Sequence, residues 1–140
     1  MSLTVRRLSK ELLAEALPDI ARLRIAVFRD WPYLYDGDAV YEERYLRPYL
    51  DSPGACVVGA FDGARLVGAA TATPLADHAD DFAAAFEGAG MDLATLYYCA
   101  ESVLLPDYRG QGAGHRFFDL REEAAREQGF REVCFASVIR

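Results

Sequence analysis

Three glycines at alternate positions, Gly110, Gly112 and Gly114, separate an apolar, strand-like segment from a helical pattern. Glycine permits left-handed backbone angles and leaves neighbouring backbone amides uncovered, because it has no Cβ. The first amides of a helix also lie at the positive end of its dipole and attract anions. A strand that passes through glycines into a helix therefore predicts a phosphate-binding turn, and with it a fold that contains both strands and helices.

The spacing of the three glycines narrows the choice of phosphate ligand. A P-loop needs a Gly-Lys-Ser/Thr ending, which this turn lacks, and a dinucleotide fingerprint needs Gly-x-Gly-x-x-Gly rather than Gly-x-Gly-x-Gly. The dinucleotide motif also follows the first strand of its domain. Here one helix and one strand remain after the turn, so its position in the chain argues against a nucleotide-binding domain of that kind.

Hydrophobic periodicity predicts a mixed α+β fold with a mostly antiparallel central sheet flanked by helices. A strand is expected at 3–7, and a helical region runs from Ser9 to near Arg29, with Pro18 in the first turn of a helix. The remaining elements follow in order: a helix around 41–50, strands at 55–61 and 65–75 joined by an Asp62-Gly63 turn, a helix at 77–86, a strand at 96–105, a helix that Gly129 stops, and a strand at 133–139. The last strand returns through a helix, which implies parallel pairing with the strand before the glycines.

Length and charge restrict the class of protein further. The 140 residues suit a single domain, 1–140, and 22 acidic against 15 basic residues give a formal net charge of −7. No basic stripe is present, so we expect no nucleic-acid partner. No secretion signal or bilayer-length apolar run is present either, so we expect a cytoplasmic protein without a membrane partner. Cys56, Cys99 and Cys134 lie far apart in apolar runs, which indicates reduced core thiols and no metal site.

The stretch Arg109–Gly114, Arg-Gly-Gln-Gly-Ala-Gly, resembles the signature Gln/Arg-x-x-Gly-x-Gly/Ala of the GNAT family of N-acetyltransferases. The preceding residues Val103–Tyr108 look like that family's strand and its approach to the turn, and the element order from Leu3 to Ile139 agrees with its fold. The resemblance implies that acetyl-CoA is the cosubstrate. Its pyrophosphate would lie on the amides of residues 111–114, close to positive side chains.

The resemblance also implies a path for the rest of the cofactor. In such folds the fourth and fifth strands splay apart after a bulge, and the pantetheine lies along the fourth strand, here on the backbone groups of Val103 and Leu105. The cofactor-binding residues that we expect are Val103, Leu104, Leu105, Arg109, Gly110, Gln111, Gly112, Ala113, Gly114, His115 and Arg116.

Acetyl transfer to an amine needs a neutral nucleophile, a stabilised oxyanion and a proton for the leaving thiolate. Glu101, on the strand before the turn, is the candidate general base; the alternative is a carboxylate that faces solvent or an arginine. Ser102 beside it either binds substrate or pantetheine or has no role in the site. Tyr33, Tyr35 and Asp36 suit a cationic acceptor amine through cation–π attraction and ion pairing, or else form a surface turn.

Three functions remain open from the sequence. The first is transfer of acetyl from acetyl-CoA to a primary amine of a small molecule or peptide, by direct attack in a ternary complex. The second is a non-catalytic acetyl-CoA-binding module, because members of the resembling family continue past the fifth strand, whereas this sequence ends at Arg140. An apolar strand edge left open there predicts a possible homodimer. The third, a fragment of a dinucleotide-binding oxidoreductase, rests on the glycines alone.

Overall fold

The structure, a computed structural model, describes residues 3–29, 37–78 and 95–135. Within these ranges the strands and helices follow one another in the order that the sequence predicts. The elements are β1 (Leu3–Arg7), α1 (Lys10–Phe28), α2 (Ala39–Asp51), β2 (Cys56–Asp62), β3 (Arg65–Pro74), a 3₁₀ helix (Leu75–His78), β4 (Leu96–Leu104), a second 3₁₀ helix (Pro106–Tyr108), α4 (Ala113–Glu127) and β5 (Glu132–Phe135).

One five-stranded sheet forms the centre of the described chain, with the strand order β1-β2-β3-β4-β5. The first three pairs of neighbours are antiparallel, and β4 and β5 are parallel. The predicted α+β class, with a mixed and mostly antiparallel sheet, is therefore confirmed. Of the strand expected at 133–139, residues 136–139 lie outside the described part, as do residues 79–86 of the helix expected at 77–86.

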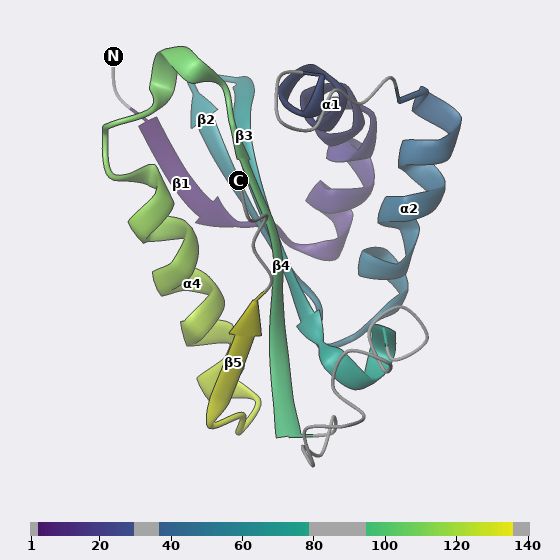
Figure 1. The fold of residues 1–140 in the computed structure, drawn as a ribbon, viewed down its shortest axis with the longest axis vertical. Helices are drawn as coiled ribbons and strands as arrows, with labels where there is room; N and C mark the ends of the chain where they lie inside the picture. The colour runs from purple at the N-terminus through teal and green to yellow at the C-terminus, as the bar shows by residue number, and fades with distance from the viewer. Residues whose placement is uncertain (1–2, 30–36, 79–94, 136–140) are drawn as a thin grey trace.

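Helices cover both faces of the sheet, with α1 and α2 on one face and α4 on the other (Figure 1). Each face has its own apolar cluster, because successive side chains of a strand point to opposite sides. Val57 of β2 and Ala69 of β3 pack with α1 and α2, whereas the next residues, Val58 and Ala70, pack with α4. The sheet is thus the middle of three layers.

Helix α1 begins one residue after Ser9, whose side-chain oxygen accepts a hydrogen bond from the Leu12 N–H at 3.2 Å. Pro18 lies inside this helix rather than in a first turn, so the prediction for Pro18 was wrong. A proline there removes one backbone donor. The helix nevertheless continues, because Pro18 is exposed and the carbonyl that it leaves unpaired belongs to the exposed Ala14, where water can reach it, while Leu17 and its neighbours bury the opposite face.

Two adjacent phenylalanines of α4 differ in what they contribute to this fold. Phe117 is 1% exposed in the α4 cluster, and Phe118 is 41% exposed. We expect Phe117→Ala to lower the free energy of unfolding by about 3–5 kcal/mol, because it leaves a cavity. Phe118→Ala, the matched control, should cost about 1 kcal/mol or less. Urea denaturation measures both, and equal losses would contradict the placement of α4 on the sheet.

Candidate active site

A bulge in β4 directs Glu101 to the face of the sheet that α1 and α2 cover. Ala70 pairs with Ser102 and Ala72 with Cys99, so that two residues of β4 lie opposite Thr71 alone. An extra residue of this kind interrupts the alternation of side chains. Tyr97 and Cys99 pack with α4, but Ala100 and Glu101 both turn toward α1 and α2. In a regular strand Glu101 would face α4.

Among the described residues, β4 and β5 pair from Leu96 to Cys99 of β4, and β4 continues past this pairing to Leu104. Figure 1 shows β5 ending partway along β4. Within the described residues, the last part of β4 therefore has no strand on the side away from β3, and its backbone groups there form an open edge.

The alternation of backbone hydrogen bonds identifies which residues offer their groups at this open edge. The Leu105 N–H donates to the Val67 carbonyl at 3.0 Å, toward β3. Alternate residues of a strand point their backbone groups to opposite neighbours, so the groups of Val103 also face β3. Within the described residues, the backbone groups of Ser102 and Leu104 therefore face the open edge, and those of Val103 and Leu105 face β3.

The glycine turn follows β4 directly and opens α4. Gly110 and Gly112 have positive φ angles of 82° and 85°, and Gly112 is the N-cap of α4 with no side-chain cap. The first hydrogen bond onto this cap runs from the Arg116 N–H to the Gly112 carbonyl, at 3.2 Å. The earlier amides of the helix are the unpaired donors found at every helix start. Residues 109–112 and 114–116 are exposed, so these donors face solvent.

Arg109 ties the turn back to the end of β4, because its Nε–H donates to the Leu104 carbonyl at 3.2 Å. Its guanidinium therefore lies beside the open edge, at the same end as the glycines. The exposed side chains of His115 and Arg116 follow in the first turn of α4. These residues give the turn positive charge in addition to its backbone donors.

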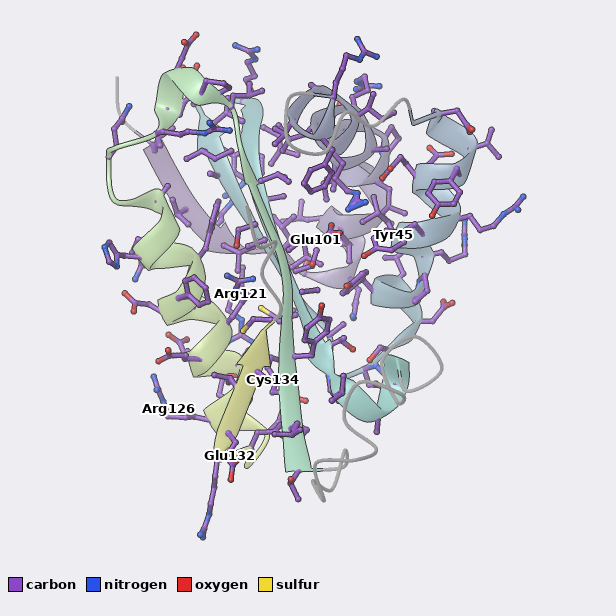
Figure 2. The ribbon with its side chains drawn as sticks, in the orientation of Figure 1. Tyr45, Glu101, Arg121, Arg126, Glu132 and Cys134 are labelled. Carbon is purple, nitrogen blue, oxygen red and sulfur yellow. The ribbon has the colours of Figure 1, made fainter. Side chains whose placement is uncertain are left out.

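Glu101 meets two partners on the α1–α2 side of the sheet. Its Oε2 accepts a hydrogen bond from Arg24 Nη1, and its Oε1 accepts one from the Tyr45 hydroxyl at 3.1 Å. Figure 2 shows Glu101 and Tyr45 on neighbouring elements, β4 and α2. Arg24 also donates from Nε to Glu42 Oε2 at 2.6 Å, so a single guanidinium bridges two carboxylates.

This cluster is buried at its base and open at Glu101. The side chains of Arg24 and Glu42 are 8% and 0% exposed, against 27% for Glu101. Burial alone lowers the pKa of Arg24, but the carboxylates of Glu101 and Glu42 outweigh that effect and raise it. Burial, with Glu101 adding to it, raises the pKa of Tyr45. Tyr45 therefore stays a hydroxyl donor to Glu101 at neutral pH.

A second buried arginine, Arg121 of α4, holds the opposite side of the bulge. Its Nη1 donates to the carbonyls of Thr71 and Glu101, both at 3.2 Å, and its Nη2 donates to Ser102 Oγ at 2.9 Å. The Glu101 N–H in turn donates to Thr71 Oγ1 at 3.2 Å. The polar groups that the bulge removes from the strand ladder are thus paired again.

The predicted site residues divide into three groups. Glu101 and Ser102 lie side by side at the bulge, and the cofactor-binding residues continue from there along β4 into the turn. Tyr33, Tyr35 and Asp36 lie outside the described residues.

Sequence reasoning missed three contributors to the site, Arg24, Tyr45 and Arg121. Tyr45 lies between Tyr41 and Tyr49 at four-residue spacing on α2, a pattern that is more typical of a core-facing helix than of a site. Each arginine occupies a core position of its helix beside a buried leucine, Leu23 or Leu120. A charged residue at such a position was the available signal.

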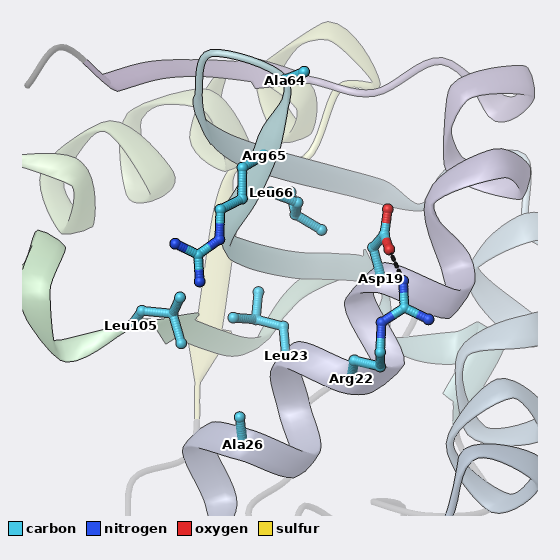
Figure 3. A pocket seen from close by; sticks show the side chains of 8 residues that line it. All are labelled: Asp19, Arg22, Leu23, Ala26, Ala64, Arg65, Leu66 and Leu105. Carbon is cyan, nitrogen blue, oxygen red and sulfur yellow. Dashed lines mark hydrogen bonds and ion pairs between the residues drawn. The ribbon is translucent and has the colours of Figure 1, made fainter.

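A separate hollow lies between α1 and the β2–β3 hairpin (Figure 3). Leu105 lines one side, and the side chain of Arg65 projects toward it. On α1, Arg22 is paired with Asp19. The hollow therefore borders the last residues before the glycine turn, on the face opposite α4.

In this α+β fold, the open edge of β4 thus leads directly into a turn with unpaired backbone donors and positive side chains. Residues 17–140 match the model of the acetyltransferase (GNAT) family, and the chain belongs to this family. No curated protein matches the sequence. Among the described residues, no helix is long and apolar enough to cross a membrane, and no group of metal-binding side chains occurs.

Solved structures with the same fold are distant in sequence. The aminoglycoside N-acetyltransferase AAC(6')-Iy, solved with the bisubstrate analogue CoA-S-monomethyl-acetylneamine, is 17% identical, with a TM-score of 0.66 over 99% of this chain and 81% of that one. The aminoglycoside acetyltransferase meta-AAC0020 from an uncultured soil metagenomic sample, with sisomicin, is 20% identical, with a TM-score of 0.64 over 97% and 78%. A ribosomal-protein-alanine N-acetyltransferase from Brucella melitensis biovar Abortus 2308 is 17% identical, with a TM-score of 0.66 over 99% and 82%.

The buried tyrosine side chains should make the free energy of unfolding decrease at alkaline pH. Burial raises the pKa of Tyr49 to about 12, whereas an unfolded tyrosine titrates near 10. The folded state then keeps a proton that the unfolded state loses, so this contribution is present below about pH 10 and disappears by about pH 12. We expect Tyr49→Phe to reduce the loss of unfolding free energy between pH 9 and 11 by about 1 kcal/mol. Urea denaturation at each pH measures it, and identical declines in both proteins would contradict the prediction.

Proposed function

We propose that this chain transfers an acetyl group from acetyl-CoA to a primary amine of a small molecule or peptide, by direct attack in a ternary complex. The observation that carries the proposal is continuity along β4: past its described pairing with β5, the strand runs on to Leu104 and leads into the glycine turn that starts α4. Backbone donors for a pyrophosphate and a strand edge for an amide-containing arm thus lie on one path.

In this proposal the pyrophosphate lies on the amides of residues 111–114, where uncapped helix donors and left-handed glycines suit an anion. Arg109, His115 and Arg116 add positive charge. The pantetheine then extends along β4, with its amides on the backbone groups of Ser102 and Leu104. The solved relative that carries a CoA-based bisubstrate analogue supports this choice of cofactor.

The same path brings the acetyl group to the bulge. Glu101 is the proposed general base, acting directly or through a water on the ammonium group of the acceptor. Its side chain is 27% exposed and retains contact with Arg24, so the Tyr45 contact at 3.1 Å is the one that an amine or water would replace. A backbone N–H of β4 would polarise the thioester carbonyl, and one such donor is worth roughly 3 kcal/mol in the transition state.

The proposed acceptor is a cationic amine. Two carboxylates share one guanidinium at the bulge, so the cluster of Arg24, Glu42 and Glu101 keeps a surplus negative charge. A net charge of −7 on the chain adds a weaker attraction for cations. The aminoglycosides named with the solved relatives are amines of this kind. Tyr33, Tyr35 and Asp36 are proposed to line the acceptor side.

A second candidate function is a non-catalytic acetyl-CoA-binding module. The observation in its favour is that both carboxylate oxygens of Glu101 already accept hydrogen bonds. Acetyl-CoA binding without turnover across a broad panel of amines would support it. One amine that is acetylated would exclude it.

The phosphate turn can be tested with two glycines of equal backbone strain. Gly112 and Gly129 have φ angles of 85° and 84°, and no atom lies within 4 Å of a Cβ at either position. We expect Gly112→Leu to weaken acetyl-CoA binding at least ~10-fold, because the new side chain distorts and covers the turn. Gly129→Leu, at the far end of α4, should bind as the wild type does. Calorimetric titration, with NAD as a second ligand, measures both, and unchanged affinity in Gly112→Leu would refute the proposed cradle.

The proposed base is tested by Glu101→Gln, which keeps an oxygen for Tyr45 but removes the charge. We expect kcat to fall by about 10²–10⁴ and the acidic limb of the pH–rate profile to disappear, with little change in acetyl-CoA affinity. Glu123→Gln, on the exposed face of α4, is the matched control. A Glu101→Gln enzyme with the wild-type kcat and pH profile would remove Glu101 from the mechanism.

A further inference from the structure

Ser102 connects a buried positive charge to the open edge of β4. Its Oγ accepts a hydrogen bond from Arg121 Nη2 at 2.9 Å, and Arg121 is 1% exposed, whereas Ser102 itself is exposed. Figure 2 shows Arg121 reaching from α4 toward β4. A hydroxyl group has one proton and two lone pairs. One lone pair of Ser102 is used by Arg121, and its proton has no acceptor among the described residues.

The charge of Arg121 is not neutralised by its described surroundings. No described carboxylate lies within ion-pair distance of it, and the carboxylate of Glu101 turns to the other face of the sheet, toward Arg24. The titratable groups that act on Arg121 are the thiols of Cys56 on β2 and Cys99 on β4 and the phenols of Tyr97 on β4 and Tyr49 on α2.

Each of these four groups is neutral near pH 7. Burial raises the pKa of Cys56, Cys99 and Tyr97, and it raises that of Tyr49 to about 12. Burial also lowers the pKa of Arg121, but a guanidinium remains protonated in proteins. A full positive charge therefore lies directly behind the Ser102 hydroxyl, in surroundings that screen it poorly.

We propose that Ser102, polarised by Arg121, donates a hydrogen bond to the sulfur of coenzyme A and stabilises it as a thiolate. The inference rests on the proposed function, which places the pantetheine on this edge of β4. It assigns an anion-stabilising group to the leaving atom, on the face of the sheet opposite Glu101.

The step balances without a proton from Ser102. The amine nitrogen forms a bond to the acetyl carbon, the carbon–sulfur bond breaks, and its electron pair goes to sulfur. The proton that nitrogen loses passes to Glu101 or to water. Because an alkoxide is far more basic than a thiolate, Ser102 keeps its proton and donates only a hydrogen bond, and the thiolate leaves as an anion.

The alternative is that Arg121 only holds the bulge, with Ser102 as one more acceptor. Comparing coenzyme A with desulfo-coenzyme A, which lacks the thiol, separates the two without knowledge of the acceptor amine. Calorimetric titrations with both ligands from pH 6 to 9 give the ionisation of the bound thiol. We expect the affinity advantage of coenzyme A to rise at least ~10-fold with pH, since a thiolate is bound more tightly than a thiol.

Ser102→Ala should lose most of this pH-dependent advantage while it binds desulfo-coenzyme A as the wild type does. Ser102→Thr, which restores a hydroxyl, should regain it. The exposed position of Ser102 makes both variants compatible with folding. If Ser102→Ala keeps the wild-type pH dependence, or the wild type shows none, this inference is overturned and the proposed function stands. A folded wild type that binds neither ligand overturns both.

Discussion

The site depends on the hydrogen bonds that the guanidinium of Arg121 donates to the bulge in β4 from the α4 face of the sheet. An extra residue in β4 leaves backbone groups without partners in the strand ladder, and buried groups of this kind are costly when unpaired. Arg121 donates hydrogen bonds to the carbonyls of Thr71 and Glu101, and the Thr71 hydroxyl oxygen accepts one from the Glu101 N–H. With these groups paired, the bulge is a stable feature of the sheet. The direction of Glu101 follows from its position.

The bulge also separates charge across the sheet. On the α1–α2 side, Arg24 lies between Glu42 and Glu101, and this cluster carries one more negative than positive charge. On the α4 side, Arg121 has only neutral partners among the described residues. In the proposed reaction a cationic amine arrives at the negative side and an anionic thiolate departs from the positive side. The charges on the two faces of the sheet are thus opposite in sign to those of the proposed substrate and leaving group.

Local patterns in the sequence were sufficient for the elements but not for the register between them. The strand at Leu3–Arg7 and the hairpin at Asp62-Gly63 depend on neighbouring residues, and both were predicted correctly. The β3–β4 register decides which side each backbone group of β4 faces, and it directs the groups of Ser102 and Leu104, rather than those of Val103 and Leu105, to the open edge. That register depends on the bulge, and the bulge depends on Arg121, about twenty positions further along the chain. The local pattern of hydrophobic residues gives no information about a contact between residues so far apart in the chain.

The low sequence identity to the solved relatives agrees with how the site is built, because parts of it consist of backbone groups rather than side chains. In the proposed function the open edge and the helix-start amides bind the cofactor through backbone groups, which many sequences can present if glycines occupy the left-handed positions. Identities of 17–20% are compatible with one shared fold for this reason. In the proposed function, selection of the acceptor would depend instead on side chains such as Arg24, Tyr45 and Glu101, which the fold leaves free to vary. In the proposed function, the charge arrangement at the bulge favours a cationic acceptor.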